Sequence, residues 1–322
     1  MSTIAVDAMG GDSAPEEVVK GAILAKKEGV DVILSGDENL IKSYLGNEKI
    51  PVINYPQVIS MDDDPAKAIR SNKDSSIIGA LNLVKEKKAD AVFSAGSTGA
   101  TLIGAISVLG KIKGVTRPTI ASVLPGKEKE VILVDSGANL EVKPKVLYQF
   151  AIMGSKLSEL LFDIENPRIG LINNGEESSK GRELEKATFK LLKSSQLNFI
   201  GNVEGKDFAN SKVDVFVTDG FTGNVVLKTL QGVAKLQQDL ISKSLKENLF
   251  KPLLVPVKNA ISPVKSMLNP NSTNGSYLLG VNGLVIIGHG SSNSEAIKNA
   301  LLFTSRAVEK RFINKFTEVS SE

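Results

Sequence analysis

The segment Lys212–Leu230, KVDVFVTDGFTGNVVLKTL, contains a pattern that recurs along the chain. β-Branched and aromatic residues at 213–217 stop at a polar turn, and an apolar pattern of helical period follows, which predicts strand, turn and helix. Ligands bind at the carboxyl ends of strands in open α/β sheets, because helix N-termini there favour an anion. Gly220 and Gly223 would let the backbone approach such an anion, and Asn224 would add an amide. A single turn of this kind is equally compatible with an ordinary helix cap.

Five other segments repeat this order, with an apolar run that stops at a cluster of Gly, Ser, Asn or Asp. The clusters are DAMGGDSAP at 7–15, SAGSTGAT at 94–101, DSGANLEVKP at 135–144, NNGEESSKG at 173–181 and GHGSSNSE at 288–295. Since the six loops share one composition, we expect them to form one shared site.

Composition restricts the class of protein. The chain has 322 residues, of which 42% are hydrophobic and 23% charged, which is typical of one large α/β domain or two lobes. The absence of Cys and the single His exclude a thiolate nucleophile, disulfides and a His-rich metal centre, and we expect neither metal nor cofactor. A net charge of +3 gives no argument for nucleic acid. With no long apolar run and no leader pattern, we expect a cytoplasmic protein.

Strand and helix patterns alternate throughout and predict an α/β fold with a mixed, mostly parallel sheet. We expect residues 1–322 to form a single α/β chain in two lobes. Two neighbouring strands at 119–124 and 131–134 are joined by PGKE, a hairpin signal that requires some antiparallel pairing. Helices are expected at 15–29, 38–45, 75–88, 97–109, 144–161 and 179–194, and 60–73 is either a solvated helix or a basic face over the site.

A long helix beginning near Gly223 and a different kind of segment after it predict a helical hairpin over 225–280. Residues 250–268 carry apolar side chains at spacings of four and three, with lysines on another face and two prolines that divide the segment. This stripe either packs on a dimer partner or enters the lipid headgroup region. The candidate membrane contacts are Leu253, Leu254, Val257, Ile261 and Val264.

The loop at 288–293 resembles the start of a dinucleotide fingerprint, but Asn293 replaces the third glycine and no strand ending in Asp follows, which argues against nicotinamide binding. His289, between two glycines, is either structural or a donor to a ligand oxygen. The chain has no Gly-x-Ser-x-Gly elbow and no Walker loop. Its loops offer amides, hydroxyls and the ammonium of Lys180, which suit catalysis by positioning and charge stabilisation of phosphate or an acyl oxyanion.

An ordered set of motifs resembles the PlsX family, the bacterial phosphate acyltransferases of phospholipid synthesis. The motifs are IAVDAMGGDSAP, SAGSTGA, RPTIASVLP, DSGAN, QFAIMG, NGEESSKG, DGFTGNVVLK and LLGVNGLVIIGHGSS, and they run from Ile4 to Ser292. The resemblance implies a three-layer α/β/α fold like the isocitrate and isopropylmalate dehydrogenases and phosphotransacetylase. It implies a homodimer that moves a long acyl chain from acyl carrier protein to inorganic phosphate. A membrane glycerol-3-phosphate acyltransferase would use the acyl phosphate, and the enzyme would associate peripherally with the inner face of the cell membrane.

By resemblance, Lys180 and Asn224 are the catalytic residues, with Lys180 as charge partner of phosphate or of the oxyanion and Asn224 as an orienting donor. The glycine-rich loops supply the candidate substrate-binding residues Asp7, Gly10, Gly11, Gly96, Ser97, Thr98, Gly99, Asn139, Gly220, Gly223, His289, Gly290 and Ser291. The chain departs from the family pattern at Ser97, Gly126, Ser136 and Asn174.

Two other functions stay open at this point. One is a phosphotransacetylase-like transfer from acyl-coenzyme A, and the other is a scaffold that docks carrier protein at the membrane. An acidic carrier could dock on basic residues in two regions, namely Lys251, Lys258 and Lys265, or Arg306, Lys310, Arg311 and Lys315.

Overall fold

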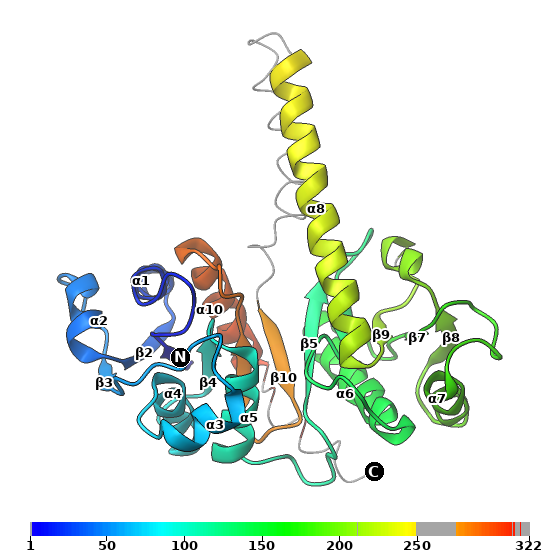
Figure 1. The fold of residues 1–322 in the computed structure, drawn as a ribbon, viewed down its shortest axis with the longest axis horizontal. Coiled ribbons are helices and arrows are strands. Elements are labelled where there is room, and N and C mark those ends of the chain that lie inside the picture. The colour runs from blue at the N-terminus through cyan, green and yellow to red at the C-terminus, as the bar shows by residue number, and fades with distance from the viewer. Residues whose placement is uncertain (1, 211, 249–274, 311, 313–315, 317–322) are drawn as a thin grey trace.

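The computed structural model describes residues 2–210, 212–248, 275–310, 312 and 316. Their eleven strands form one sheet with the order β3-β2-β1-β4-β11-β10-β5-β6-β9-β7-β8 (Figure 1). The strands are β1 Thr3–Asp7, β2 Asp31–Gly36, β3 Val52–Asn54, β4 Ala91–Ser94, β5 Thr119–Leu124, β6 Val131–Val134, β7 Ile169–Ile172, β8 Phe199–Val203, β9 Val215–Val217, β10 Ser276–Leu279 and β11 Leu284–Ile287.

Most strand pairs are parallel, and the exceptions lie in the middle of the sheet. β10 is antiparallel to both β11 and β5, and β5 is antiparallel to β6. The block β3-β2-β1-β4-β11 therefore runs opposite to the block β6-β9-β7-β8. The mixed, mostly parallel sheet predicted from the sequence is confirmed, including the antiparallel pair at 119–134.

Helices cover both faces of the sheet, as the period-2 pattern of the strands requires. On β1, Ile4 and Val6 join the core that contains α1 and α10, whereas Ala5 joins the core under α4 and α5. Within the described residues, the helices and one 3-10 turn are α1 Glu16–Lys27, α2 Glu38–Leu45, α3 Pro65–Ser71, α4 Ser76–Lys85, α5 Thr98–Val108, α6 Pro144–Phe162, α7 Glu183–Lys193, η1 Gly205–Asn210, α8 Gly220–Asn248 and α10 Ser294–Glu309.

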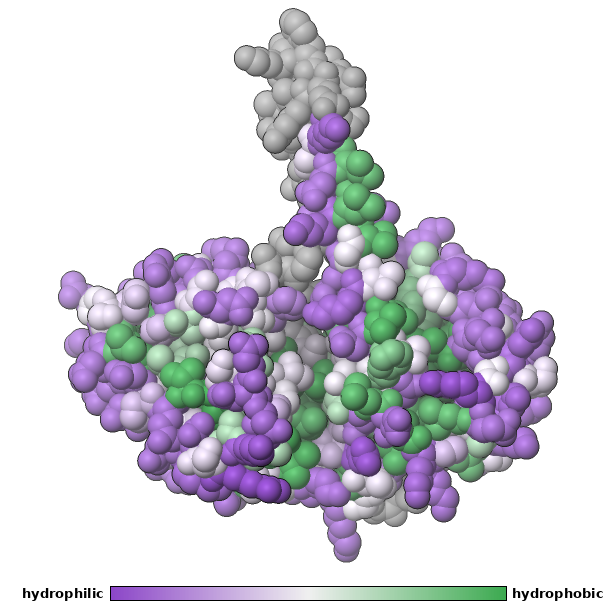
Figure 2. All heavy atoms as spheres, in the orientation of Figure 1, coloured by the Kyte–Doolittle hydropathy of each residue, from purple (hydrophilic) through white to green (hydrophobic). Residues whose placement is uncertain are grey.

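Helix α8 leaves the body of the molecule and projects well beyond it (Figure 1). Its first turns pack on the sheet through Val226, Leu227 and Leu230. Farther along, the exposed Val233, Leu236 and Leu240 form a green strip in Figure 2. The predicted long helix is therefore present, whereas the second arm of the predicted hairpin and all five candidate membrane contacts fall in 249–274, outside the described residues.

Two helices begin four or five residues later than predicted. The helix expected at 179–194 begins only at Glu183, because Gly181 has φ +92° and the side chain of Glu185 accepts from the Arg182 N–H to start the helix there. The segment 60–73 is helical only over Pro65–Ser71, where Asp64 accepts from the N–H of Lys67 as N-cap.

Candidate active site

The two blocks of strands with opposite directions are joined in the middle of the sheet by β10 and β5. One row of residues that are level with one another across β11, β10, β5 and β6 forms the floor of the site. Ile287 is level with Ser276, Ser276 with Ser122, and Ser122 with Leu133. β11 and β6 run in opposite directions, but both are short, so their carboxyl ends fall within one residue of this row. The ends lie three strands apart, which is roughly 14 Å at the usual strand spacing.

A cavity of about 320 Å³ lies above this row. It contains three of the residues predicted for the site, namely Thr98 at the start of α5, Asn224 in the first turn of α8 and His289 in the loop after β11. Its other lining residues are Ile120, Ser122, Val123, Leu124, Ser136, Gly137, Leu227, Lys228, Gln231, Gly275, Ser276, Ile287 and Gly288. The volume suits a small ligand or the reacting end of a larger one.

Three serine hydroxyls are linked on the floor of the cavity. The Ser122 hydroxyl donates to that of Ser136 at 2.7 Å and shares a hydrogen bond with that of Ser276 at 2.8 Å. The Ser136 hydroxyl donates to the carbonyl of Ile120 at 3.1 Å. Because hydroxyls rotate and can donate or accept, this chain of hydrogen bonds can reorganise around an oxyanion.

Two nitrogen donors converge at the side of the cavity. Lys228 Nζ lies 3.4 Å from His289 Nε2. The backbone N–H of Ser291 points at His289 Nδ1 at 3.3 Å, and an N–H can only donate. Nδ1 is therefore the accepting nitrogen, and the neutral ring carries its proton on Nε2, which faces the Lys228 ammonium. Burial, and then the Lys228 charge, lower the pKa of His289, which keeps the ring neutral.

The loops after β1, β4 and β11 pack against one another beside this cavity. A Cβ at Gly10 would lie 2.7 Å from the backbone nitrogen of Gly96, and the N–H of Asp12 donates to the carbonyl of Gly290 at 2.8 Å. Asp7 accepts from the Ser94 hydroxyl at 2.6 Å and so ties β1 to β4. Burial raises the pKa of Asp7.

Other predicted residues of these loops have local contacts of their own. The Ser97 hydroxyl accepts from the N–H of Ala100 as N-cap of α5, at 3.4 Å, and a Cβ at Gly99 would meet Pro65 at 2.7 Å. Gly11 has φ +122°, and the Ser291 hydroxyl bonds to His289 Nδ1 at 2.9 Å. Of this set, only Thr98 and His289 line the main cavity.

The loops after β6 and β9 form a second packed pair. Asp135 accepts from the backbone N–H of Asn139 and from its side-chain amide, both at 2.8 Å. The N–H of Gly220 donates to the carbonyl of Asn139 at 2.8 Å. A Cβ at Gly223 would lie 1.8 Å from the carbonyl oxygen of Asp135. The lack of a Cβ at Gly223 is therefore required by this contact between loops.

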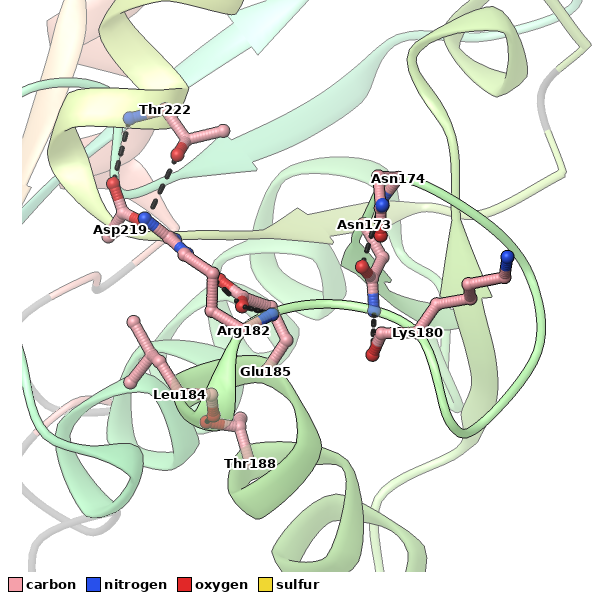
Figure 3. Close-up of polar contacts among 9 residues, drawn as sticks. All are labelled: Asn173, Asn174, Lys180, Arg182, Leu184, Glu185, Thr188, Asp219 and Thr222. Atoms are coloured by element: carbon pink, nitrogen blue, oxygen red, sulfur yellow. Dashed lines mark hydrogen bonds and ion pairs between the residues drawn. The ribbon is translucent and has the colours of Figure 1, made fainter.

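Lys180 does not line the cavity. It is exposed on the loop between β7 and α7, and its carbonyl accepts from the Asn173 amide at 3.2 Å. Figure 3 shows its side chain directed away from Arg182 and Asp219. Arg182 forms ion pairs of 2.5 Å with Glu185 of α7 and with Asp219, and both raise its pKa. The pair with Asp219 joins this loop to the start of α8. The loop is thus attached next to the site, with its lysine outside the cavity.

Sequence reasoning missed Lys228 and the serines at 122 and 276. Lys228 follows Asn224 by four residues, which places both on one face of α8. That spacing was a usable signal, because Asn224 was already assigned to the site. Ser122 and Ser276 lie on central strands that are paired over a long sequence separation, and no local pattern marks them.

The comparisons with known proteins agree with this architecture. The sequence profile described as "Fatty acid synthesis protein" matches residues 2–315. Proteins named "Phosphate acyltransferase" are 45% identical in Pelotomaculum thermopropionicum, over 96% of this chain and 92% of the relative, and 43% identical in Halothermothrix orenii, over 96% of both.

Solved structures share the fold at low identity. The EutD phosphotransacetylase from Staphylococcus aureus superposes with a TM-score of 0.62 at 18% identity, over 95% of this chain and 93% of that one. A 4-hydroxythreonine-4-phosphate dehydrogenase from Klebsiella pneumoniae gives 0.55 at 12% identity, over 94% and 98%. The fold is therefore that of phosphotransacetylases and of this dehydrogenase. From the profile match and the close relatives together, we conclude that this chain belongs to the fatty acid synthesis protein family, in which its curated relatives are named phosphate acyltransferases.

Proposed function

We propose that this protein transfers an acyl group from a thioester to inorganic phosphate and releases acyl phosphate. The observation that carries the proposal is the pair Lys228 and His289. Two donors 3.4 Å apart cannot satisfy each other, and an anionic oxygen between them would accept from both. Phosphate offers several such oxygens, and the relatives are named for transfer to it.

In the proposed reaction, a phosphate oxygen attacks the thioester carbonyl, so that a C–O bond forms and the C–S bond breaks. The thiolate leaves and takes up the proton that phosphate loses. Since phosphate itself is the nucleophile, no side chain needs to be acylated. Lys228 and His289 would hold phosphate, and Asn224 and the serine hydroxyls would donate to the carbonyl oxygen as it becomes negative.

Lys180 is proposed as an additional catalytic residue on the family resemblance alone. Its loop is joined to the start of α8 by the ion pair of Arg182 with Asp219, five residues before Asn224. The same resemblance supports an isocitrate-dehydrogenase-like arrangement, in which the two strand blocks are the expected lobes.

The proposed donor is a long-chain acyl carrier protein, and the product would pass to a membrane glycerol-3-phosphate acyltransferase. The test is to incubate the purified protein with palmitoyl carrier protein and phosphate and to titrate the free carrier thiol. Release of thiol that requires both protein and phosphate, with acyl phosphate formed in equal amount, supports the proposal. Release without phosphate, or none from the carrier but some from palmitoyl-coenzyme A, contradicts it.

We also propose a homodimer that contacts the inner face of the membrane peripherally. The dimer is supported by the exposed apolar side chains along α8, since such a strip on a projecting helix is normally covered. Leu236→Glu with Leu240→Glu should convert a dimer to a monomer in analytical ultracentrifugation.

No helix in the described ranges is both long and apolar enough to cross a bilayer. For membrane contact, Leu254→Glu should abolish flotation with anionic vesicles and leave the dimer intact.

A further inference from the structure

A second and larger hollow lies along α7, and it shares no lining residue with the candidate active-site cavity. It is an open groove of about 1160 Å³ between α7, the N-terminal end of α6 and the loop before α7. Its floor is apolar, with the half-buried Ala187, Phe189 and Leu191. Phe189 is held in place by edge-to-face contact with Phe199, with ring centroids 5.2 Å apart.

The walls of the groove carry a strong excess of positive charge. Five lysines line it, namely Lys143, Lys145, Lys186, Lys190 and Lys193, against a single glutamate, Glu183. Glu183 pairs with Lys186 at 3.3 Å. The structure records no ion pair for the other four lysines within its described residues, and all four are exposed. These four ammonium groups can therefore form ion pairs with the carboxylates of a partner.

The placement of two of these lysines is unfavourable within the chain itself. Lys143 is the N-cap of α6 and Lys145 lies in its first turn, which has no acidic residue. Cations at a helix N-terminus oppose the helix dipole, which favours anions there. A carboxylate-bearing partner in the groove would relieve this repulsion.

The three lysines of α7 are spaced to meet a helix. Lys186, Lys190 and Lys193 stand at intervals of four and three residues, so they share one face and rise by roughly 6 and 4.5 Å along the axis. An acidic helix with carboxylates at the same intervals presents the complementary row. An open groove with an apolar floor suits the side of such a helix better than it suits a compact ligand, which needs enclosure.

We infer that this groove is the docking surface for the acidic carrier protein that delivers the acyl thioester, with an acidic helix of the carrier lying along α7. The inference rests on the proposed function. The loop after β6 connects the two places, because Gly137 lines the cavity and Lys143 lines the groove. They are six positions apart in the chain, so their Cα atoms lie at most about 22 Å apart. A carrier seated on α7 would hold its flexible thioester arm beside the cavity.

The experiment measures binding of a fluorescently labelled carrier protein without an acyl chain, so that the cavity takes no part. The test variant is Lys190→Glu with Lys193→Glu. The matched control is Lys49→Glu with Lys85→Glu, which makes the same charge change on exposed lysines of the loop before β3 and of α4, at the other end of the sheet. Urea unfolding of each variant checks that the fold is retained.

The test variant should bind the carrier at least tenfold more weakly than wild type, while the control stays within twofold. The affinity of wild type should also fall steeply with added salt. Unchanged carrier affinity in the folded test variant overturns the inference. The inference is also overturned if the test variant loses binding to phosphatidylglycerol vesicles but keeps its affinity for the carrier, because the groove would then recognise lipid. Wild type that binds the carrier through these lysines but transfers no acyl group would refute the proposed function and leave the docking surface standing.

Discussion

The substitution Lys228→Met removes one of the two donors proposed to hold phosphate and keeps an unbranched apolar stem of similar length. A hydrogen bond from a charged group contributes about 1.5–3 kcal/mol. Lys228 is exposed, so solvent screening places the loss near the lower end. Since about 1.4 kcal/mol corresponds to a factor of ten, kcat/KM for phosphate should fall about tenfold.

The same substitution has a spectroscopic consequence that does not depend on turnover. The chain contains a single histidine, so its NMR titration reports His289 alone. The positive charge of Lys228 helps to lower the pKa of His289, and its removal should therefore raise that pKa. The pKa should stay below the ordinary histidine value, because burial also lowers it. Added phosphate should raise the pKa of His289 in wild type, since a nearby anion favours the protonated ring.

The matched control is Lys235→Met, seven residues farther along α8 on the same face and outside the cavity lining. It should leave both kcat/KM and the histidine titration unchanged. The reasoning is wrong if Lys228→Met leaves the pKa of His289 unchanged, or if both lysine variants lower kcat/KM for phosphate to the same extent.

Three further predictions concern stability and the neighbouring loop. Gly223→Ala should lower the free energy of unfolding, measured by urea titration, by about 3 kcal/mol or more, since its Cβ would lie 1.8 Å from a carbonyl oxygen of the loop after β6. Gly232→Ala places a Cβ with nothing within 4 Å and should raise the free energy of unfolding by about 1 kcal/mol. Burial raises the pKa of Asp7, so its contribution to stability is present below the usual carboxyl pKa and is lost as pH rises through the raised value. Asp7→Asn can still bond to Ser94 and should flatten the pH dependence of unfolding over that window, and an unaltered profile would contradict the assignment. Lys180→Ala should abolish acyl phosphate formation without moving the His289 titration, and near-normal turnover would remove Lys180 from the mechanism.

The alternation of strand and helix could be predicted because it depends on local periodicity. The segment Lys212–Leu230 illustrates this, since β9 and α8 lie where the pattern places them. The helix boundary at 179–194 was less accurate, because Gly181 and the contacts of Arg182 with Glu185 and Asp219 end the loop four residues later than the apolar pattern suggests.

The direction of the strands could not be predicted in the same way. Strand β10 is short and pairs with β5 across nearly half the chain, and this pairing reverses the sheet. The six similar loops were expected to form one shared site, but strand blocks of opposite direction carry them. They converge only as far as the strand registers allow. The loops after β6 and β11 and the starts of α5 and α8 line the cavity, whereas the Lys180 loop does not.

The glycines correctly indicated where the backbone makes a close contact, but the sequence does not show which group makes that contact. Gly223 was assigned to a bound anion, whereas the structure shows a protein carbonyl in contact range of its missing Cβ. Lys228, in contrast, was not predicted for the site but lines the cavity. As one cation on a polar helix face it resembles any solvated lysine, and only the packing of the first turns of α8 on β5, β6 and β9 brings it to His289.

Helix α8 connects the two parts of the protein that chemistry and assembly would use. Its first turns present Asn224, Lys228 and Gln231 to the cavity at intervals of four and three residues. Its later turns present Leu236 and Leu240 to the outside. Because a continuous helix fixes the rotation of every residue about its axis, whatever covers the outer strip also restricts how the cavity face can turn. A second copy bound along α8 would therefore stabilise the orientation of Lys228 toward His289 without contacting either residue.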